Sequence, residues 1–283
     1  MILLVDAGNS RLKWGWLKAG RYRHGGALDY EQGNARRSLA EQAWGDAAPP
    51  RAVFVASVAG PSLRRSLTAW MRHHWQLKPR FLVAEAEAQG VRNAYTRPAR
   101  LGVDRWLAMI GARKRFRGHL CLVDCGTAIT LDVLAKDGRH LGGLIVPGLQ
   151  AMQRALAREG AALALPAEVE TAVPAATEGT LFAADTENAI HLGTLYEAVA
   201  LVDRVMEDVR LELGGGVRLV LTGGDAGRLQ PLLANRPTRV DDLVLRGLAI
   251  MAQATLERDG ETAAAVPPDE APVTADVATR DLV

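Results

Sequence analysis

Residues 1–10 of the chain read MILLVDAGNS and residues 120–128 read LCLVDCGTA, so a short apolar run ends in an Asp-x-Gly turn twice. Each run is apolar at every position, which is typical of a strand buried within a layered α/β domain. After each turn the chain resumes with a stretch of alternating polar and apolar residues, Leu12–Trp16 and Ile129–Leu134. Each unit is therefore predicted to be a β-hairpin with a functional turn, and this internal repeat indicates the architecture.

Helical patterns lie between and after the two hairpins. The hydrophobic spacing predicts helices over Pro61–Trp75, Leu101–Phe116, Leu149–Arg158, Glu187–Glu212 and Leu243–Glu257. Further strands are expected over Arg80–Ala84 and Val217–Leu221. Strands that alternate with helices indicate an α/β architecture. Residues 259–283 are rich in Ala, Pro, Asp, Glu and Thr without a sustained period, so they are predicted to form a disordered tail.

The bulk composition is that of a globular protein and narrows its partners. The 283 residues include 34 Lys and Arg against 32 Asp and Glu, with no basic run of five or more, so no nucleic-acid partner is expected. Cys121 and Cys125 would lie about 13 Å apart on one strand, too far for a disulfide, which indicates a reducing compartment. Neither a signal peptide nor a membrane span is expected, because the apolar run at residues 2–5 is short and ends at Asp6. The expected location is the cytoplasm.

The two turns carry groups that suit phosphate and a cation. Glycine lets the backbone turn sharply and approach a ligand, and successive N–H groups form a concavity for anions. Ser10 and Thr127 add hydroxyl donors, Lys13 adds positive charge, and Asp6 and Asp124 can hold Mg²⁺ directly or through water. An Asp-x-Gly turn is also a common hairpin turn, so either one alone leaves both interpretations open. Two at equivalent positions favour a divided nucleotide site.

A third glycine-rich turn follows the strand predicted over Val217–Leu221. The adjacent glycines of Thr222-Gly223-Gly224-Asp225 would let a base or ribose rest on bare backbone, although a tight turn after a strand explains them equally well. The sequence has no G-x-x-x-x-G-K-[ST] loop and no G-x-G-x-x-G between a strand and a helix. A P-loop kinase and a Rossmann dinucleotide fold are therefore disfavoured.

Acid–base chemistry is expected where the helix over Leu101–Phe116 begins. Asp104 beside Arg105 could simply satisfy helix-end donors and the helix dipole. Combined with the phosphate turns, the pair supplies what phosphoryl transfer to an alcohol also needs. Asp104 can accept the hydroxyl proton and Arg105 can orient the acceptor. Transfer without a phospho-enzyme is expected, because no histidine or serine is paired with a base as a nucleophile would be.

Five motifs resemble, in order, those of the type III pantothenate kinases, a family to which the name Bvg accessory factor has also been attached. They are Asp6–Ser10, Tyr95 with Leu101–Arg105, Asp124–Ala128, Gly142–Gly148 and Thr222–Asp225. The resemblance runs from Met1 to about Glu257. It implies a duplicated actin-like (ribonuclease H-like) fold, with an N-terminal domain over residues 1–115, a C-terminal domain over residues 116–258 and ATP in the cleft between them. It also implies a homodimer that transfers the ATP γ-phosphoryl group to the hydroxyl of pantothenate, the first step of coenzyme A synthesis.

The resemblance further implies roles for single residues. The ATP site would consist of Asp6, Ala7, Gly8, Asn9, Ser10, Arg11, Leu12, Lys13 and Thr127. Asp104 would be the catalytic base, and pantothenate would contact Tyr95, Gly102, Val103, Asp104, Arg105 and Thr186. Asp124 would hold a monovalent cation, K⁺ or NH₄⁺, which the family requires beside Mg²⁺. Thr180 competes with Thr186, and Ser10 stands where the family usually has threonine, a difference that keeps the hydroxyl.

Two other functions remain open from the sequence. Another actin-like kinase, acting on a sugar, would share the fold, and only the segment around Asp104 separates the two. A regulatory protein with a degenerate nucleotide fold would instead bind a partner, as the name Bvg accessory factor suggests. The retained hydroxyls of Ser10 and Thr127 and the Asp104–Arg105 pair argue against degeneration.

Overall fold

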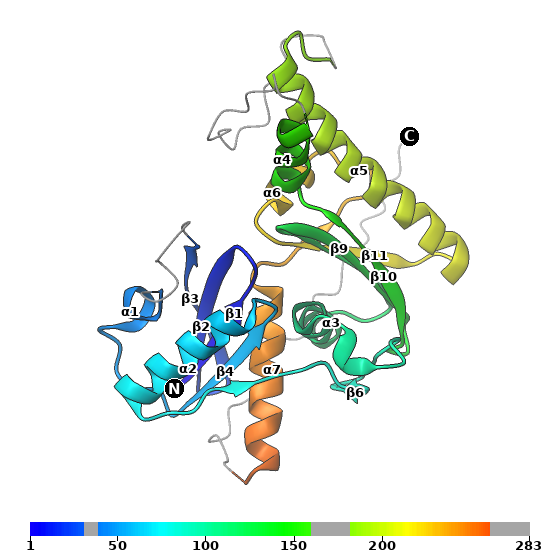
Figure 1. Ribbon diagram of the computed structural model, residues 1–283. Helices are drawn as coiled ribbons and strands as arrows, with labels where there is room; N and C mark the ends of the chain where they lie inside the picture. Colours follow the sequence, from blue (N-terminus) through cyan, green and yellow to red (C-terminus); the bar gives the residue numbers. More distant parts are fainter. Residues whose placement is uncertain (31–38, 160–181, 261–283) are drawn as a thin grey trace, which may run out of the picture.

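Two five-stranded sheets with matching strand orders form the centre of the molecule (Figure 1). The computed structural model describes residues 1–30, 39–159 and 182–260. The first sheet has the order β3-β2-β1-β4-β5, and the second has the order β10-β9-β8-β11-β12. The first contains β1 (Ile2–Ala7), β2 (Arg11–Lys18), β3 (Arg21–Asp29), β4 (Ala52–Ser57) and β5 (Arg80–Phe81). The second contains β8 (His119–Cys125), β9 (Ala128–Leu134), β10 (His140–Pro147), β11 (Val217–Thr222) and β12 (Thr238–Arg239). A small separate sheet pairs β6 (Glu87–Ala88) with β7 (Val91–Arg92).

The two large sheets repeat the same pairing. β1 pairs antiparallel with β2 and parallel with β4, as β8 pairs antiparallel with β9 and parallel with β11. In the hairpin registers Asp6 lies opposite Lys13, and Asp124 lies opposite Thr130. The predicted repeat of strand, turn and strand is therefore confirmed, and with it the duplicated α/β architecture. Because β1 and β8 hold the same place in their sheets, the two Asp-x-Gly turns leave the sheets at equivalent points.

The helices agree with the predicted ranges to within two residues at each end. They are α2 (Pro61–Trp75), α3 (Val103–Arg115), α4 (Leu149–Glu159), α5 (Thr186–Leu213) and α7 (Leu243–Arg258). Two short helices, α1 (Leu39–Trp44) and α6 (Ala226–Leu229), and a 3₁₀ turn over Pro98–Arg100 were not predicted. The strand expected over Arg80–Ala84 is shorter, because β5 pairs with β4 at only two positions.

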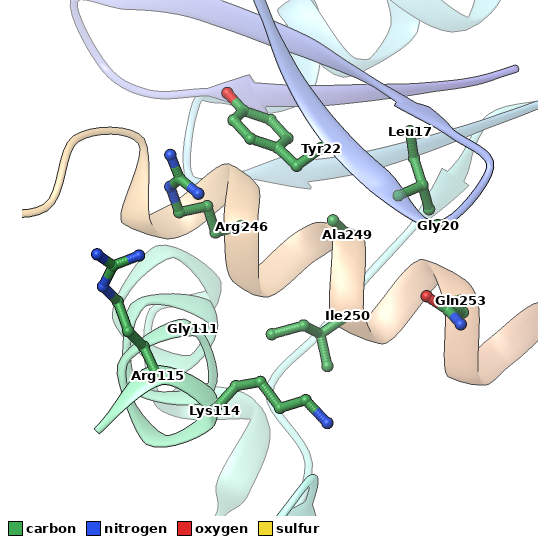
Figure 2. A pocket seen from close by; sticks show the side chains of 10 residues that line it. All are labelled: Leu17, Gly20, Tyr22, Gly111, Lys114, Arg115, Arg246, Ala249, Ile250 and Gln253. Atoms are coloured by element: carbon green, nitrogen blue, oxygen red, sulfur yellow. The ribbon is translucent and has the colours of Figure 1, made fainter. Parts of the chain in front are cut away.

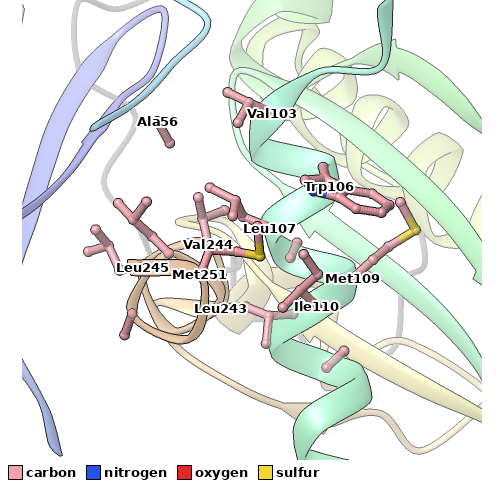
Figure 3. Packing of buried hydrophobic residues seen from close by; sticks show 14 of the residues in the cluster. Ala56, Val103, Trp106, Leu107, Met109, Ile110, Leu243, Val244, Leu245 and Met251 are labelled. Carbon is pink, nitrogen blue, oxygen red and sulfur yellow. The ribbon is translucent and has the colours of Figure 1, made fainter. Parts of the chain in front are cut away.

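Helices α3 and α7 pack against each other and join the two halves of the fold (Figure 3). One cluster of buried side chains contains Leu4 of β1, Leu107 of α3, Leu122 of β8 and Leu248 of α7, so it reaches both sheets. Two glycines allow the helices to cross closely. A Cβ atom at Gly111 would lie 2.7 Å from the carbonyl oxygen of Leu243, and one at Gly247 would collide with the carbonyl oxygen of Leu107. The crossing therefore depends on glycine at both positions.

The cysteines, the search for membrane spans, the tail and the domain boundary complete the comparison with the predicted features. Cys121 and Cys125 both lie in β8, and both are buried free thiols, as predicted. No helix among the described residues is long and apolar enough to cross a membrane. Of the predicted tail, residues 261–283 lie outside the described residues. The division into domains at residues 115 and 116 stays a prediction; α7, near the end of the described chain, packs on the first sheet through β1 and β4.

Candidate active site

The two Asp-x-Gly turns meet although they belong to different sheets. The hydroxyl of Thr127 donates a hydrogen bond of 3.0 Å to the hydroxyl oxygen of Ser10. Within the turns, the N–H of Gly8 donates to the carbonyl oxygen of Arg11, and the N–H of Gly126 donates to that of Ala128, both at 3.1 Å. These glycine N–H groups are therefore engaged inside their own turns. A phosphate at the meeting point would be contacted first by the exposed hydroxyls.

A cleft of about 480 Å³ adjoins this meeting point. Both hairpins and the third glycine-rich turn line it, through Asp6, Lys13, Asp124, Thr222, Gly223 and Gly224. The three segments that the sequence analysis singled out for a nucleotide site thus come together in one cleft. Its volume is in the range of ordinary small-molecule sites.

Gly223 brings the third turn into contact with the second hairpin. Its φ is +96°, a left-handed conformation that favours glycine, and a Cβ atom there would lie 2.5 Å from Oδ1 of Asp124. In the parallel pairing of β11 with β8, Thr222 lies next to Asp124. The backbone of the third turn therefore covers the Asp124 carboxylate, and a side chain at position 223 would displace it.

Buried carboxylates in and beside the cleft lie close enough to raise one another's pKa values. Burial raises the pKa of Asp6 to about 7; Lys13 opposes this, and the nearby carboxylates of Asp104 and Asp124 add to it. Burial also raises the pKa of Asp124 to about 6, again against the charge of Lys13 and with the help of Asp104. The pKa of Asp104 is raised by burial as well, against a hydrogen bond from the N–H of Arg105. Such a group of like charges favours a bound cation.

The donor set suits a cation that keeps part of its own water. No group of three or more His, Cys, Asp or Glu side chains among the described residues is arranged to hold a metal ion. Mg²⁺ is commonly bound by one or two carboxylates together with waters and substrate phosphates rather than by a full protein cage. Asp6 and Asp124 fit that pattern, since they line the same cleft at the ends of β1 and β8.

Asp104 and Arg105 lie in the first turn of α3, where the sequence analysis placed the acceptor site. Gly102 is the N-cap residue of α3. The N–H of Arg105 donates a hydrogen bond of 2.8 Å to Oδ1 of Asp104. The side chain of Arg105 donates through Nη1 to the hydroxyl of Tyr95 at 3.1 Å. The structure therefore joins Tyr95, Gly102, Asp104 and Arg105 in one place, and the carboxylate of Asp104 lies close enough to Asp6 and Asp124 to raise their pKa values.

Other predicted residues are placed differently. The side chains of Ala7, Leu12 and Val103 are buried in the core, so a ligand could meet only their backbone. Arg11 lines the cleft, but its guanidinium forms a two-pronged ion pair with Asp29 of β3. Asn9 is exposed in the first turn.

Thr186 is the one predicted site residue that the structure keeps apart from the others. It is the first residue of α5, whose N-cap is Asp185. Figure 1 shows this end of α5 at the top of the view, with the second sheet between it and α3. The competing candidate, Thr180, lies outside the described residues.

The structure adds site residues that the sequence analysis missed. Asp242 lines the cleft, accepts a hydrogen bond of 2.9 Å from the hydroxyl of Tyr22, and lies 2.8 Å from Nδ1 of His24. Asp132 of β9 holds the side chain of Arg105, and His140 of β10 in turn contacts Asp132. Asp132 falls on a polar position of the alternating stretch Ile129–Leu134, so no local signal marks its role. Its partner Arg105 was predicted as a site residue, whereas no local pattern connects His140, on the next strand, with either of them.

A second cavity of about 210 Å³ is lined in part by Tyr22, whose hydroxyl donates to Asp242 of the first cleft (Figure 2 shows the residues that line this cavity). The end of α3 supplies Lys114 and Arg115 and α7 supplies Arg246, while Leu17 and Ile250 form an apolar wall. None of the described residues that line it is a carboxylate. It therefore lacks the groups that phosphoryl transfer to an alcohol needs, and the cleft beside Asp6 is the candidate active site.

Matching sheets whose Asp-x-Gly turns meet beside a polar cleft define the class of fold as duplicated and actin-like. Solved structures share the fold. A Baf family transcriptional activator from Campylobacter jejuni superposes with a TM-score of 0.55 at 19% identity, over 92% of this chain and 100% of that one. The activator of the 2-hydroxyisocaproyl-CoA dehydratase from Clostridium difficile, with bound ADPNP, superposes with a TM-score of 0.51 at 10% identity. The match covers 92% of this chain and 97% of that one.

Among proteins of this fold, the sequence comparisons are specific. The model of the family described as type III pantothenate kinase matches residues 2–208. The type III pantothenate kinase of Nitrosococcus oceani is 46% identical over 93% of this chain and 97% of its own length. The type III pantothenate kinase of Paraburkholderia phymatum is 38% identical over 88% of this chain and 93% of its own length. The chain belongs to the type III pantothenate kinase family, as the resemblance of its motifs indicated.

Proposed function

We propose that this protein transfers the γ-phosphoryl group of ATP to the primary hydroxyl of pantothenate, which yields 4′-phosphopantothenate and ADP in the first step of coenzyme A synthesis. The observation that carries the proposal is the contact between Ser10 and Thr127, which joins both phosphate turns in a chain of this family. The reaction would take place in the cytoplasm, where the buried free thiols of Cys121 and Cys125 suit a reducing compartment.

The nucleotide half of the site comprises the segment from Asp6 to Lys13 together with Thr127. The exposed hydroxyls of Ser10 and Thr127 would donate to phosphate oxygens, and Lys13 would add positive charge in the adjoining cleft. Mg²⁺ would be held by Asp6, through water or directly, and would neutralise charge on the phosphates. The raised pKa of Asp6 supports this role, because a divalent cation would stabilise its ionised carboxylate.

The acceptor half lies at the start of α3. Asp104 accepts the proton of the attacking hydroxyl as the bond to the phosphorus atom forms and the bond to the ADP oxygen breaks. Tyr95, Gly102, Val103 and Arg105 bind pantothenate and set the position of its hydroxyl. The transition state of phosphoryl transfer is loose, so positioning and charge neutralisation supply most of the acceleration.

Asp124 is the proposed ligand of the monovalent cation, K⁺ or NH₄⁺. Its carboxylate lies at the end of β8, in the cleft and under the backbone of Gly223, where the carbonyl oxygen of Cys125 also faces that backbone. A monovalent cation there would offset the charge of Asp124 without competing for the Mg²⁺ position at Asp6. Substituting Asp124 by asparagine should therefore weaken the dependence on K⁺ more than the dependence on Mg²⁺.

The homodimer that the family resemblance implies has support in the second sheet. β10 is an edge strand, and it exposes Leu144 and Ile145 to solvent in one chain. Exposed apolar edge strands are unfavourable in a monomer and are usually covered. Thr186 fits the same proposal, because a residue so far from α3 could contact pantothenate only at the site of a second copy. Ile145→Lys should therefore shift the protein toward a monomer in sedimentation velocity, whereas Lys136→Glu, an exposed change before β10, should not.

The experiment that tests the proposed reaction is ADP release by the purified chain with MgATP and pantothenate. It is run in K⁺, NH₄⁺ or Na⁺, with product mass measured and glucose as a control alcohol. The expected product is pantothenate plus one phosphoryl group, formed faster in K⁺ or NH₄⁺. Turnover of glucose but not of pantothenate would replace the proposal by a sugar kinase. Equal rates in all three salts would remove the monovalent cation from it.

A further inference from the structure

Four side chains beside Asp104 form one hydrogen-bonded group, which we name the Arg105 network: Tyr95, Arg105, Asp132 and His140. Arg105 donates through Nε to Oδ2 of Asp132 at 2.8 Å and through Nη2 to Oδ1 at 2.7 Å. This two-pronged geometry fixes the plane of the guanidinium, which a single contact would leave free to rotate. The remaining terminal nitrogen, Nη1, is thereby aimed at the hydroxyl of Tyr95, 3.1 Å away.

His140 holds Asp132 and Tyr95 from the neighbouring strand. Its Nε2 lies 2.8 Å from Oδ1 of Asp132, and its ring lies parallel to that of Tyr95, with an interplanar angle of 11° and centroids 6.3 Å apart. The side chain of His140 has no exposed surface, and those of Arg105 and Asp132 are only 6% and 5% exposed. Mutual hydrogen bonds within a buried group of this kind restrict the positions of its side chains.

Gly143 of β10 leaves the space that the guanidinium occupies. A Cβ atom at this position would lie 2.7 Å from Oδ1 of Asp132 and would collide with Nη2 of Arg105 and the carbonyl oxygen of Leu131. The φ of Gly143 does not fall in the left-handed region. Glycine at 143 is thus required both by the backbone of the paired strand β9 and by the room for Arg105.

We infer that Asp132 and His140 are positioning residues for the acceptor: they hold Arg105 and Tyr95 at a fixed distance from Asp104, and so set where the hydroxyl lies. The inference rests on the proposed function, since it assigns the substrate contacts to Tyr95 and Arg105. Asp104 and Arg105 are consecutive residues of α3 and share a hydrogen bond. Rotation of the guanidinium would therefore move the acceptor relative to the base, and a misplacement of about 1 Å can cost about 100-fold in rate.

A purely structural ion pair would stabilise the fold without this effect, and kinetics separate the two. Asp132→Asn should lower kcat/KM for pantothenate by about 10- to 100-fold and change KM for ATP by no more than about two-fold. Asp137→Asn is the matched control, because Asp137 is an exposed acid between β9 and β10 that pairs with Arg92 and Arg139. It should leave both constants unchanged. The inference would be overturned if a folded Asp132→Asn protein kept the wild-type kcat/KM for pantothenate. It would also be overturned if the KM for ATP changed by as large a factor as kcat/KM for pantothenate.

Two substitutions of His140 keep the test decisive if Asp132→Asn does not fold, because both leave the Arg105–Asp132 pair intact. His140→Gln offers a donor near the position of Nε2, whereas His140→Phe keeps the ring against Tyr95 and removes the donor. A loss in kcat/KM for pantothenate that is larger for phenylalanine than for glutamine is expected. Equal constants for both variants and the wild type would overturn the role of His140 and, without a folded Asp132 variant, the inference.

The geometry can be read without substrate, which separates this inference from the proposed reaction. In ¹⁵N NMR spectra, the Nε–H of a guanidinium held by a buried carboxylate should exchange slowly with water. We expect one such signal that disappears in Arg105→Lys and persists in Asp137→Asn. If the wild type gives this signal but does not phosphorylate pantothenate, the proposed function fails while the network stands. If it phosphorylates pantothenate but the signal is absent, the inference fails alone.

Discussion

The hydroxyl of Thr127 lies 3.0 Å from the hydroxyl of Ser10, although 117 positions separate the two residues in the chain. Each follows the glycine of its own Asp-x-Gly turn, and each turn leaves a different sheet. Both hydroxyls are exposed, and their turns adjoin Asp6 and Asp124, which line the cleft. A phosphate group that approaches there would meet one donor from each half of the duplicated fold, so binding of the nucleotide would hold the halves together.

Removal of either hydroxyl should therefore weaken the binding of ATP and leave the binding of pantothenate unchanged. Hydrogen bonds to charged groups contribute about 1.5–3 kcal/mol, so Thr127→Val or Ser10→Ala should raise KM for ATP by about 10- to 100-fold. The KM for pantothenate should change little. Ser10→Thr and Thr127→Ser keep the hydroxyls and are the matched controls. Steady-state kinetics with each substrate varied in turn decide the matter, and a loss confined to pantothenate would contradict the assignment.

Asp104→Asn tests the catalytic base. Asparagine keeps an oxygen that can accept from the N–H of Arg105, so the start of α3 should be preserved. A general base contributes about 10²–10⁴-fold, so kcat should fall by that factor while the affinity for ATP stays close to that of the wild type. In the wild type the acid limb of the pH–rate profile should lie above the usual range of an aspartate, because burial raises the pKa of Asp104 and the base is lost as the pH falls. Near-normal turnover of the variant would remove Asp104 from this role.

The sequence predicted the parts of the site that are local in the chain. The turns at Asp6–Ser10 and Asp124–Ala128 can be predicted from the sequence, because an apolar run, an aspartate and a glycine follow one another within ten residues. Their meeting follows from the duplication, since equivalent turns of paired sheets face one cleft. The roles of the single residues in them remain predictions, which the substitutions described here test.

The rest depends on contacts that local patterns do not encode. Asp132, His140 and Asp242 reach the site from β9, β10 and the start of α7, and their partners are set only once the sheets and helices pack. The same holds for β3, which has mostly exposed residues and so gives no apolar alternation. The helical ranges were predictable because each has a sustained apolar face, but the packing of α7 on the first sheet was not.

The raised pKa of Asp6 predicts how the stability of the ligand-free protein depends on pH. With a folded-state pKa of about 7 against an ordinary 3.8, the native state binds more protons than the unfolded state between these values. The contribution of Asp6 to the free energy of unfolding is therefore present at low pH and is lost as the pH rises through about 7. Asp6→Asn should raise Tm by several degrees at pH 8 and by much less at pH 5. Thermal melts with and without Mg²⁺ measure this, and equal shifts at both pH values would contradict it.

The crossing of α3 over α7 predicts a stability effect far from the cleft. Gly247→Ala places a Cβ atom against the carbonyl oxygen of Leu107, and neither helix can yield without disturbing the cluster around Leu248. Overpacking of this kind costs about 1–3 kcal/mol, which urea unfolding should show. Gly193→Ala is the control, because Gly193 lies in α5 with no atom within 4 Å of its added Cβ. That change should stabilise the helix by about 0.5–1 kcal/mol. Equal effects at both positions would mean that the helices can separate freely.

The position of Thr186 predicts a pattern of complementation between subunits. If Thr186 contacts pantothenate at the site of a second copy, a chain with Asp104→Asn and a chain with Thr186→Val are each impaired as homodimers. In a mixed dimer, one site combines both substitutions and the other has neither, because the chain that lacks the base supplies its intact threonine to the partner. Mixed dimers purified through two different affinity tags should therefore recover about half of the wild-type turnover, given that Asp104→Asn alone costs about 10²–10⁴-fold. If Thr186 acted within its own chain, each site of the mixed dimer would carry one substitution, and turnover would stay near the mean of the two impaired homodimers. If Thr186→Val alone had wild-type kinetics, Thr186 would have no part in the acceptor site.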